Sequence, residues 1–316
     1  MKKIIIFGGS GFLGGHVADY LSKEGFRVTI FDIKESLFLR EDQRFICGDI
    51  TDKQSVEEAI KGHQIVYNFA GIADIDEAAG KPYETIYTNV LGNTHILEGC
   101  RQHNVERFLF ASTIYVYSDL GSFYRSSKQA CELIIENYYK KYGLNFTILR
   151  YGSLYGPRAN ERNPVYRFLK EALSEGKITR LGTGEEIREY IHVFDAAHFS
   201  VKALDPQYKN QYLLLSGHQQ IRVKDLMLMI KEILGNKIEL EFKDVEYEGH
   251  YNITPYNFSP KLAKKITDSS HVDLGQGLLD LLNDIYCQQR KQKQLKDNFQ
   301  ENLVSPSATS GEAVKQ

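Results

Sequence analysis

The sequence lacks tryptophan altogether and contains only four cysteines in 316 residues. The missing tryptophan excludes nothing. The cysteines, in contrast, are far apart and form no CxxC pair, which argues against a disulfide framework and against a metal site. We therefore expect reduced thiols, as in a cytoplasmic protein. The four residues are Cys47, Cys100, Cys131 and Cys287.

Long apolar runs are also missing, since none approaches the roughly 18 residues that a membrane-spanning helix needs. The first strand-like run starts at Lys3, and we expect no signal peptide before it. The net charge is −2 with both signs interspersed along the chain. Neither a nucleic acid nor a membrane is therefore an expected partner.

The N-terminal stretch carries the strongest pattern that is present. An apolar run at residues 4–7 is typical of a strand buried on both faces of a parallel sheet. Three glycines spaced GxxGxxG follow, and then apolar residues recur at helical spacing. A second β-branched run, residues 28–31, ends in Asp32. The three glycines are Gly8, Gly11 and Gly14.

This order of strand, glycine turn, helix, strand and acid predicts a dinucleotide site. Glycines let a diphosphate approach backbone N–H groups, and the positive end of the following helix favours the anion. A carboxylate at Asp32 can accept hydrogen bonds from both ribose hydroxyls and would repel a 2′-phosphate. The acid indicates NAD, whereas Lys34, two residues on, leaves NADP open.

Strands and helices alternate as far as Arg150 at a spacing that predicts a doubly wound, mostly parallel sheet. Ligands of such sheets bind beyond the carboxyl ends of the strands. We expect the residues at these ends to surround one crevice. They are Gly8, Asp32, Asp49, Ala70, Thr113 and Arg150.

Beyond Arg150 the rhythm changes, and a smaller C-terminal α/β lobe is expected. Residues 151–163 are rich in Gly, Pro, Arg and Asn and are predicted to form a loop. The predicted domains are a Rossmann-type domain at 1–152, with 188–205 packing back onto it, a substrate lobe at 153–287, and a polar, disordered tail at 288–316. Short helices are expected at 261–266 and 276–285.

Thr113, Tyr124 and Lys128 form a second signal. Tyr124 and Lys128 are four residues apart, so on a helix they project from one face. An ammonium beside a phenol favours the phenolate and lowers its pKa from about 10. Such a phenol can take a proton from a hydroxyl as hydride leaves the carbon. Taken alone, YxxxK is also common as a solvated helix pair.

Several segments resemble, in order, those of an extended short-chain dehydrogenase/reductase, of the nucleotide-sugar epimerase and dehydratase group. GGSGFLG resembles that family's glycine turn, and ASTIYVYS with FYRSSK resembles its catalytic segments. The other matching segments are GDITD, NFAG, TNVLGNT, LRYGSLYGPR and GTGEEIREYIHVFDAA. The resemblance covers the chain to about residue 285.

The resemblance implies an NAD-dependent enzyme with Thr113, Tyr124 and Lys128 as its catalytic residues. It assigns substrate binding to Ile114, Tyr115, Ser153, Arg158 and Arg188, the last as a candidate for the sugar-nucleotide diphosphate. It assigns cofactor binding to Gly8, Gly11, Phe12, Leu13, Gly14, Asp32, Ile33, Lys34, Asp49, Ile50, Phe69, Ala70, Gly71, Asn89, Tyr124, Lys128 and Tyr151.

Four departures from the family pattern bear on the reaction. Only ten residues separate Thr113 from Tyr124, so the loop over the sugar is short. Ile114 and Tyr115 stand where 4,6-dehydratases carry an Asp-Glu pair, which argues against dehydration. Ser153 replaces a frequent Asn. Glycine in place of alanine at the end of NFAG is expected to be harmless.

Several polar residues also have simpler interpretations. Arg158 is as consistent with a surface charge as with a phosphate contact. Asn89 either supports the Tyr-Lys pair through a water or bonds local backbone. His192 and His198 are expected to be structural. The acids Asp74, Asp76 and Glu77 are expected to form a solvated loop.

The leading expectation is an enzyme that oxidises a ring hydroxyl of a nucleotide sugar at C4, as a 4-epimerase. The alternative is a 4-dehydrogenase or reductase that releases or consumes the keto sugar. A more remote alternative is a dinucleotide-sensing module without turnover. The resemblance further implies a homodimer that pairs through the helices at 88–103 and 126–142.

Overall fold

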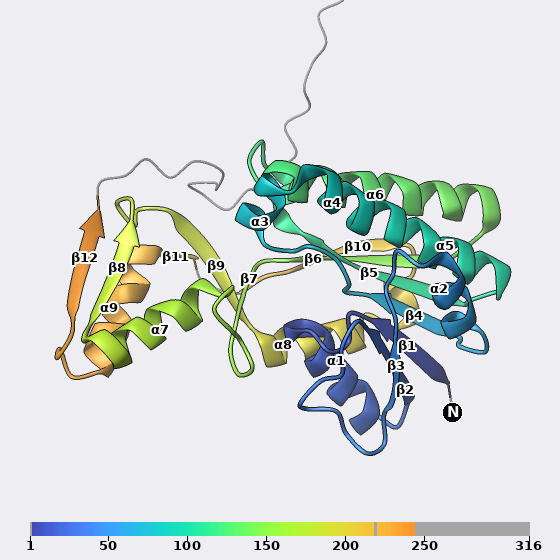
Figure 1. Ribbon diagram of the computed structural model, residues 1–316, viewed down its shortest axis with the longest axis horizontal. Coiled ribbons are helices and arrows are strands. Elements are labelled where there is room, and N and C mark those ends of the chain that lie inside the picture. The colour runs from blue at the N-terminus through green and yellow to red at the C-terminus, as the bar shows by residue number, and fades with distance from the viewer. Residues whose placement is uncertain (1, 218–219, 244–316) are drawn as a thin grey trace, which may run out of the picture. The chain divides into compact units, whose positions relative to one another are not determined.

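A seven-stranded sheet forms the centre of the computed structural model, which describes residues 2–217 and 220–243 (Figure 1). Its strand order is β10-β6-β5-β4-β1-β2-β3, and every neighbouring pair is parallel. This confirms the predicted Rossmann-type, doubly wound sheet. The strands are β1 (Lys3–Phe7), β2 (Arg27–Asp32), β3 (Arg44–Cys47), β4 (Ile65–Asn68), β5 (Arg107–Thr113), β6 (Phe146–Tyr151) and β10 (Gln211–Leu215).

Helices cover both faces of this sheet, as Figure 1 shows. On one face α1 (Phe12–Lys23) packs beside α8 (Val193–Lys202). On the other face α5 (Gly92–Gln102) lies between α2 (Lys53–Ile60) and α6 (Ser122–Tyr142). Each face has its own buried apolar cluster, because the strand side chains alternate between them.

A second group of elements follows β6. Strand β9 (Ile187–His192) pairs with β7 (Ser153–Tyr155) and with β11 (Gln220–Arg222). Strand β8 (Lys177–Leu181) pairs with β12 (Glu239–Lys243). Helices α7 (Pro164–Glu175) and α9 (Val223–Ile233) pack together over a third apolar cluster, which includes Phe168 and Met227.

The chain then returns to the large sheet, since β10 pairs with β6 although its residues fall in the predicted substrate lobe. The predicted domain limits at 152/153 and 287/288 stay predictions. The elements expected at 261–266 and 276–285, and the tail at 288–316, lie outside the described residues. Within the described part of the chain, no helix combines the length and the apolar character needed to cross a membrane.

The structure corrects two local predictions and adds detail to the helices that follow. Strand β7 lies within residues 151–163, which were predicted to be a loop. The acids expected in a solvated loop begin helix α3 (Ile75–Gly80), whose N-cap Asp74 accepts the Glu77 N–H. A further helix, α4 (Pro82–Ile86), follows. The helix predicted at 88–103 starts as a π-helical turn, Tyr87–Leu91, before α5.

Helix α6 starts four residues before its predicted beginning at 126, after Gly121 at φ +101°. It ends at Gly143, which adopts a left-handed conformation at φ +73°. Glycine adopts positive φ at little cost, so these residues set both limits of the helix. The earlier start places Tyr124 inside the first helical turn.

Gly14→Ala should lower the free energy of unfolding of the cofactor-free protein, by about 1–3 kcal/mol. A Cβ atom there would lie closer than 3.0 Å to the carbonyl oxygen of Gly8. The matched control is Gly15→Ala, whose Cβ makes only ordinary contacts and should stabilise the helix by about 0.5–1 kcal/mol. Urea unfolding checks both, and equal effects of the two variants would contradict the assigned packing.

Candidate active site

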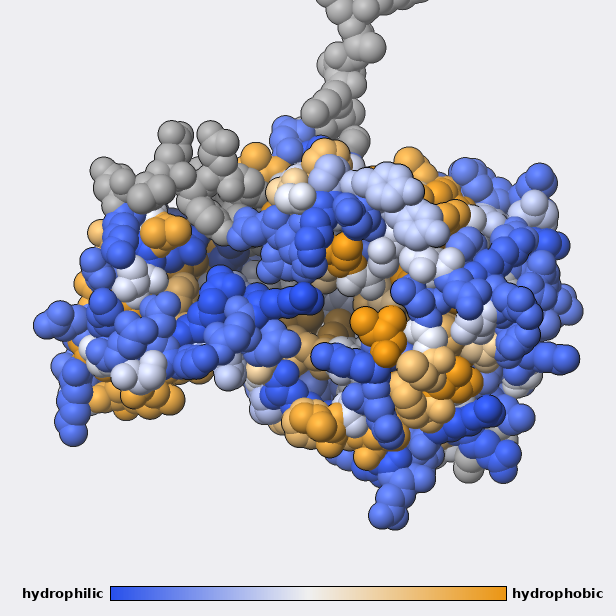
Figure 2. Space-filling model, viewed as in Figure 1, coloured by the Kyte–Doolittle hydropathy of each residue, from blue (hydrophilic) through white to orange (hydrophobic). Residues whose placement is uncertain are grey.

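A cavity of about 670 Å³ opens at the carboxyl ends of β1, β4 and β5 and extends to β7, α7 and β9. Figure 2 shows hydrophilic side chains over most of the visible face, with hydrophobic ones gathered near its middle. Many of the predicted site residues line this cavity. They are Gly8, Gly11, Phe12, Leu13, Gly14, Lys34, Phe69, Gly71, Thr113, Ile114, Tyr115, Tyr124, Lys128, Tyr151, Ser153, Arg158 and Arg188.

The glycine turn presents a polar cradle to the cavity. Helix α1 starts at Phe12, and its N-cap Gly11 supplies no side-chain hydrogen bond. The first N–H groups of a helix have no partner within it and favour an anion. The buried hydroxyl of Ser10 also has no hydrogen-bond partner. Gly8 and Gly14 leave no room for a Cβ atom, so this cradle fits a dinucleotide diphosphate.

Asp32 is bonded to this turn but lies outside the cavity lining. Its carboxylate accepts the Ser10 N–H at 3.0 Å and the Ile33 N–H at 2.8 Å. Burial raises its pKa, although both hydrogen bonds oppose that shift. Lys34 lines the cavity two residues later. The ribose contact expected of Asp32 therefore stays a prediction, with its oxygens already oriented by the turn.

Five further residues predicted from sequence lie outside the cavity lining. Asp49 accepts from the N–H and hydroxyl of Thr51, at 2.8 and 2.9 Å. Ile50 is 6% exposed, so its side chain packs in the interior rather than against a ligand. The remaining three are Ile33, Ala70 and Asn89.

Asn89 bonds local backbone, which was one of the two interpretations left open. Its amide accepts from the Ile72 N–H at 2.7 Å and donates to the Ile72 carbonyl and the Ser127 hydroxyl, both at 2.9 Å. Ser127 donates in turn to the carbonyl of Tyr124 at 2.7 Å. Asn89 therefore bonds to helix α6, which carries Tyr124 and Lys128, from outside the cavity lining.

Glycine at position 71 fits this arrangement, whereas alanine, the frequent residue of the family, would not. Gly71 has φ +145°, and a Cβ atom there would lie 2.6 Å from the side-chain oxygen of Asn89. That oxygen cannot retreat without losing its bond to Ile72. Position 71 therefore requires glycine here.

Thr113, Tyr124 and Lys128 meet at one point of the cavity wall. The Thr113 hydroxyl oxygen accepts the Tyr115 N–H at 3.2 Å, and the hydroxyl is close enough to the Tyr124 phenol to lower the pKa of that phenol. The Lys128 ammonium donates to the Ala111 carbonyl at 2.8 Å and lies 5.8 Å from the centre of the Tyr124 ring. The predicted trio therefore lies together on one part of the cavity wall.

The charge balance of this trio differs from the sequence prediction. Burial raises the pKa of Tyr124 to about 12, and the hydrogen bond with Thr113 opposes the shift only in part. Burial also lowers the pKa of Lys128 to about 8, despite the opposing effect of Glu132. Desolvation therefore outweighs the expected stabilisation of the phenolate by the ammonium in the ligand-free protein.

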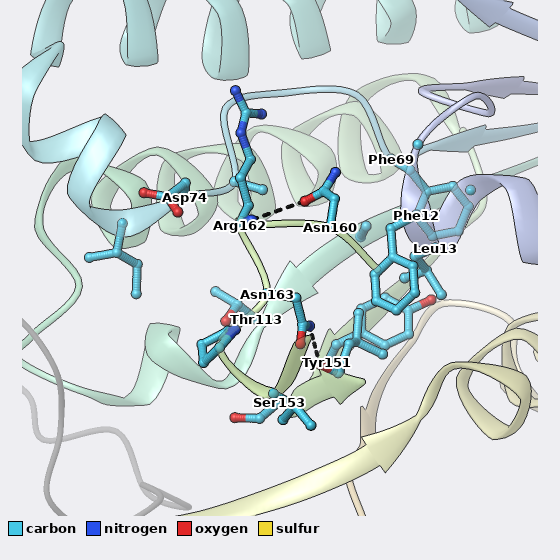
Figure 3. A pocket seen from close by; sticks show the side chains of 18 of the residues that line it. Phe12, Leu13, Phe69, Asp74, Thr113, Tyr151, Ser153, Asn160, Arg162 and Asn163 are labelled. Atoms are coloured by element: carbon cyan, nitrogen blue, oxygen red, sulfur yellow. Dashed lines mark hydrogen bonds between the residues drawn. The ribbon is translucent and has the colours of Figure 1, made fainter. Parts of the chain in front are cut away.

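The far end of the cavity gathers polar groups from the exit segment after β6. Figure 3 shows Thr113, Ser153 and Asn163 on one side, and Phe12, Leu13 and Phe69 on the other. Of the predicted substrate residues, Ile114 and Arg188 are buried in this wall, at 1% and 8% exposure. Arg188 donates to the Ile187 carbonyl at 3.0 Å.

Sequence reasoning missed several lining residues of this end. Asn163 caps α7 and donates to the Leu154 carbonyl at 2.7 Å. A cap signal, Asn followed by Pro and an apolar run, was available in the sequence. The other missed polar residues are Ser36, Asp74, Asp76, Asn160, Arg162, Arg167, Arg180 and Tyr190.

Arg158 lies beside α1 rather than beside Thr113. Its guanidinium donates to Asp19 at 2.8 Å and stacks 4.3 Å above the ring of Phe38. Asp19 belongs to α1, and Phe38 follows β2. The structure therefore brings Arg158 to the glycine-turn end of the cavity, where both Arg158 and Phe38 line the wall.

The protein family of the chain follows from its similarity to known proteins. The model of the NAD dependent epimerase/dehydratase family matches residues 4–213. The chain belongs to this family. It is an NAD-dependent enzyme of the extended short-chain dehydrogenase/reductase type that modifies nucleotide sugars, and NAD is its cofactor.

Individual relatives of the family differ in reaction. A UDP-glucuronate 4-epimerase from Thermodesulfobacterium geofontis is 24% identical over 90% of this chain and 96% of its own. A UDP-N-acetyl-alpha-D-glucosaminuronate decarboxylase from Bacillus cytotoxicus is 28% identical over 83% and 90%. The crystal structure of a Thermotoga maritima UDP-glucose 4-epimerase with UDP-glucose has a TM-score of 0.75 and 25% identity, covering 81% of this chain and 90% of that one.

Lys128→Met should raise the free energy of unfolding of the cofactor-free protein at pH 7, by on the order of 1–3 kcal/mol. The folded state lowers the pKa of Lys128 from 10.5 to about 8, so the unfolded chain binds more protons between these values. Stability contributed through Lys128 therefore rises as pH increases from about 8 to 10.5.

Urea unfolding at pH 7 and pH 9.5 measures this difference. The free energy of unfolding of the wild type should rise between these two pH values. Lys128→Met should lack the part of that rise that comes from deprotonation of Lys128. Lys140→Met is the matched control, because Lys140 lies on the same helix with its side chain 67% exposed, and it should leave the pH dependence unchanged. A loss of stability in Lys128→Met at pH 7 would contradict the assigned burial cost.

Proposed function

We propose that the protein is a nucleotide-sugar 4-epimerase in which Thr113, Tyr124 and Lys128 act on the C4 hydroxyl of the sugar. The observation that carries this proposal is their convergence on the cavity wall, with Thr113 close enough to the Tyr124 phenol to lower its pKa. NAD, when bound, supplies the hydride acceptor and a cationic ring. A tyrosine phenolate and a threonine hydroxyl at one point can hold and deprotonate a sugar hydroxyl together.

The chemistry assigns one task to each side chain. Thr113 holds the C4 oxygen, and the Tyr124 phenolate takes its proton while the C4 hydrogen leaves as hydride, which yields a 4-keto sugar and a neutral phenol. The phenolate is needed before this step, and the Lys128 ammonium, one helical turn away, would stabilise it together with the cationic ring that NAD supplies. If the keto sugar turns over in the cavity, hydride returns to its other face and Tyr124 gives the proton back. Sugar and cofactor are then restored in oxidation state, and only the C4 configuration changes.

Relatives of several reaction types begin with the same oxidation. The assignment as an epimerase therefore needs further support. The residues after Thr113, where a dehydratase would need an acid and a base, are Ile114 and Tyr115, and Ile114 is 1% exposed. A UDP-glucuronate 4-epimerase and the Thermotoga UDP-glucose 4-epimerase are among the similar proteins. The second candidate is a 4-dehydrogenase that releases the keto sugar, since it needs the same trio.

Incubation of the NAD-loaded protein with UDP-, dTDP-, GDP- and CDP-sugars should change the configuration at C4 of one of them, as followed by NMR. Tyr124→Phe should retain NAD and lose about 10²–10⁴-fold in rate, because the acid–base group is gone. Tyr139→Phe, on the exposed end of the same helix, is the control and should keep full rate. Stoichiometric NADH and keto sugar without an epimer would favour the dehydrogenase instead.

We further propose that two copies pair through the helices at 88–103 and 126–142. Large apolar side chains on these helices are exposed in the single chain, among them Leu91 at 39% and Leu133 at 61%. Burying them would be favourable. Light scattering at micromolar concentration should give twice the chain mass, and Leu133→Glu should halve it. A wild-type monomer would contradict the pairing.

A further inference from the structure

A buried carboxylate lies one helical turn beyond Lys128, on the side away from Tyr124. Glu132 is 6% exposed, and its oxygens accept three hydrogen bonds. The Ser112 hydroxyl donates at 2.6 Å, and the guanidinium of Arg150 donates from Nε at 3.0 Å and from Nη2 at 2.6 Å. Glu132 therefore joins α6 to β5 and β6 at the cavity edge.

Arg150 is held as firmly as its partner. It lies opposite Ser112 in the register of β5 and β6. Its Nη1 donates to the Tyr117 hydroxyl at 2.6 Å, and its guanidinium stacks against the rings of Tyr117 and Tyr212, at 4.7 and 4.6 Å. Sequence analysis expected Arg150 in the crevice, but the structure turns it toward Glu132. It lies behind the wall.

We propose that Glu132 and Arg150 are positioning residues of the reaction, forming a neutral buried pair that holds Thr113 against Lys128 and balances the charge around that lysine. The proposal rests on the proposed function of the catalytic trio. Ser112, which bonds Glu132, directly precedes Thr113, while Glu132 and Lys128 are four residues apart on α6. A displacement at the pair would therefore move two members of the trio relative to each other.

The electrostatic part of the argument follows from the sign of each charge. Glu132 favours the charged form of Lys128 and opposes the burial that lowers the lysine pKa. Arg150 repels the ammonium from behind Glu132. The other titratable groups at this point are Tyr124 and Cys131 on α6 and, across the cavity, the acids at the start of α3. While the pair is intact and neutral, Lys128 stays charged at neutral pH. Removing one member of the pair should change the pKa of Lys128.

Opposite substitutions in the pair therefore have opposite effects on Lys128. Glu132→Gln leaves the Arg150 charge unbalanced and should lower the lysine pKa by about one unit. Arg150→Met leaves the carboxylate unbalanced and should raise it. The Lys128 pKa of the double variant should lie between those of the two single variants. A pair that served packing alone would not move the two single variants in opposite directions.

The experiment is a lysine side-chain NMR titration of the full chain carrying ¹³Cε-lysine, with the Lys128 signal assigned by its loss in Lys128→Met. The same variants are assayed for the pH dependence of kcat, whose alkaline limb should shift with the lysine pKa. Glu136→Gln, one turn further along α6 and partly exposed, is the matched control and should shift neither. Ser112→Ala should lower kcat without a shift in either readout, because it removes only a neutral bond.

Shifts in the same direction for the two single variants, or none, would overturn the proposal. Circular dichroism identifies a variant that has not folded, in which case the sign of the shift in the remaining single variant still decides. If the wild type turns over no nucleotide sugar, the proposed function fails, while the titration still tests the electrostatic role of the pair. The two failures are thus distinguishable.

Discussion

A buried ammonium beside a half-buried phenol is the constraint on which the rest of this structure depends. Lys128 is 5% exposed and has lost most of its water, and the bond to the Ala111 carbonyl replaces only part of that hydration. The position is held because α6 packs against β5 through an apolar cluster on one face of the sheet. The helix start at Gly121 then brings Tyr124 to Thr113.

The cofactor end depends on close backbone packing instead of charge. Gly8 and Gly14 bring the turn, α1 and the end of β4 together so closely that no Cβ atom fits. The resulting cradle offers N–H groups and an unpartnered serine hydroxyl, and Lys34 and Arg158 line the cavity wall near it. Both ends of the cavity therefore carry a local cost in stability, a common feature of functional sites.

Much of this architecture was predictable from the sequence, and the exceptions have physical causes. Buried strands and amphipathic helices leave periodic signals, so the large sheet and the glycine turn followed from pattern alone. Strand β7 did not, because its three residues pair with β9, which is distant in sequence. Helix α3 carried a capping signal at Asp74 and Glu77 that was interpreted as a solvated loop. The predicted direction of the Tyr124 pKa shift was wrong, because the extent of burial is a property of the folded cavity.

The central claim is that the phenol of Tyr124 and the hydroxyl of Thr113 together hold the sugar hydroxyl that is oxidised. A crystal structure of the protein with NAD and an unreactive nucleotide sugar tests it most directly. We expect one ring hydroxyl within roughly 2.6–3.2 Å of both the Tyr124 and the Thr113 oxygen. A sugar whose ring hydroxyls all lie out of reach of Tyr124, with its carbons far from the cofactor ring, would contradict the account.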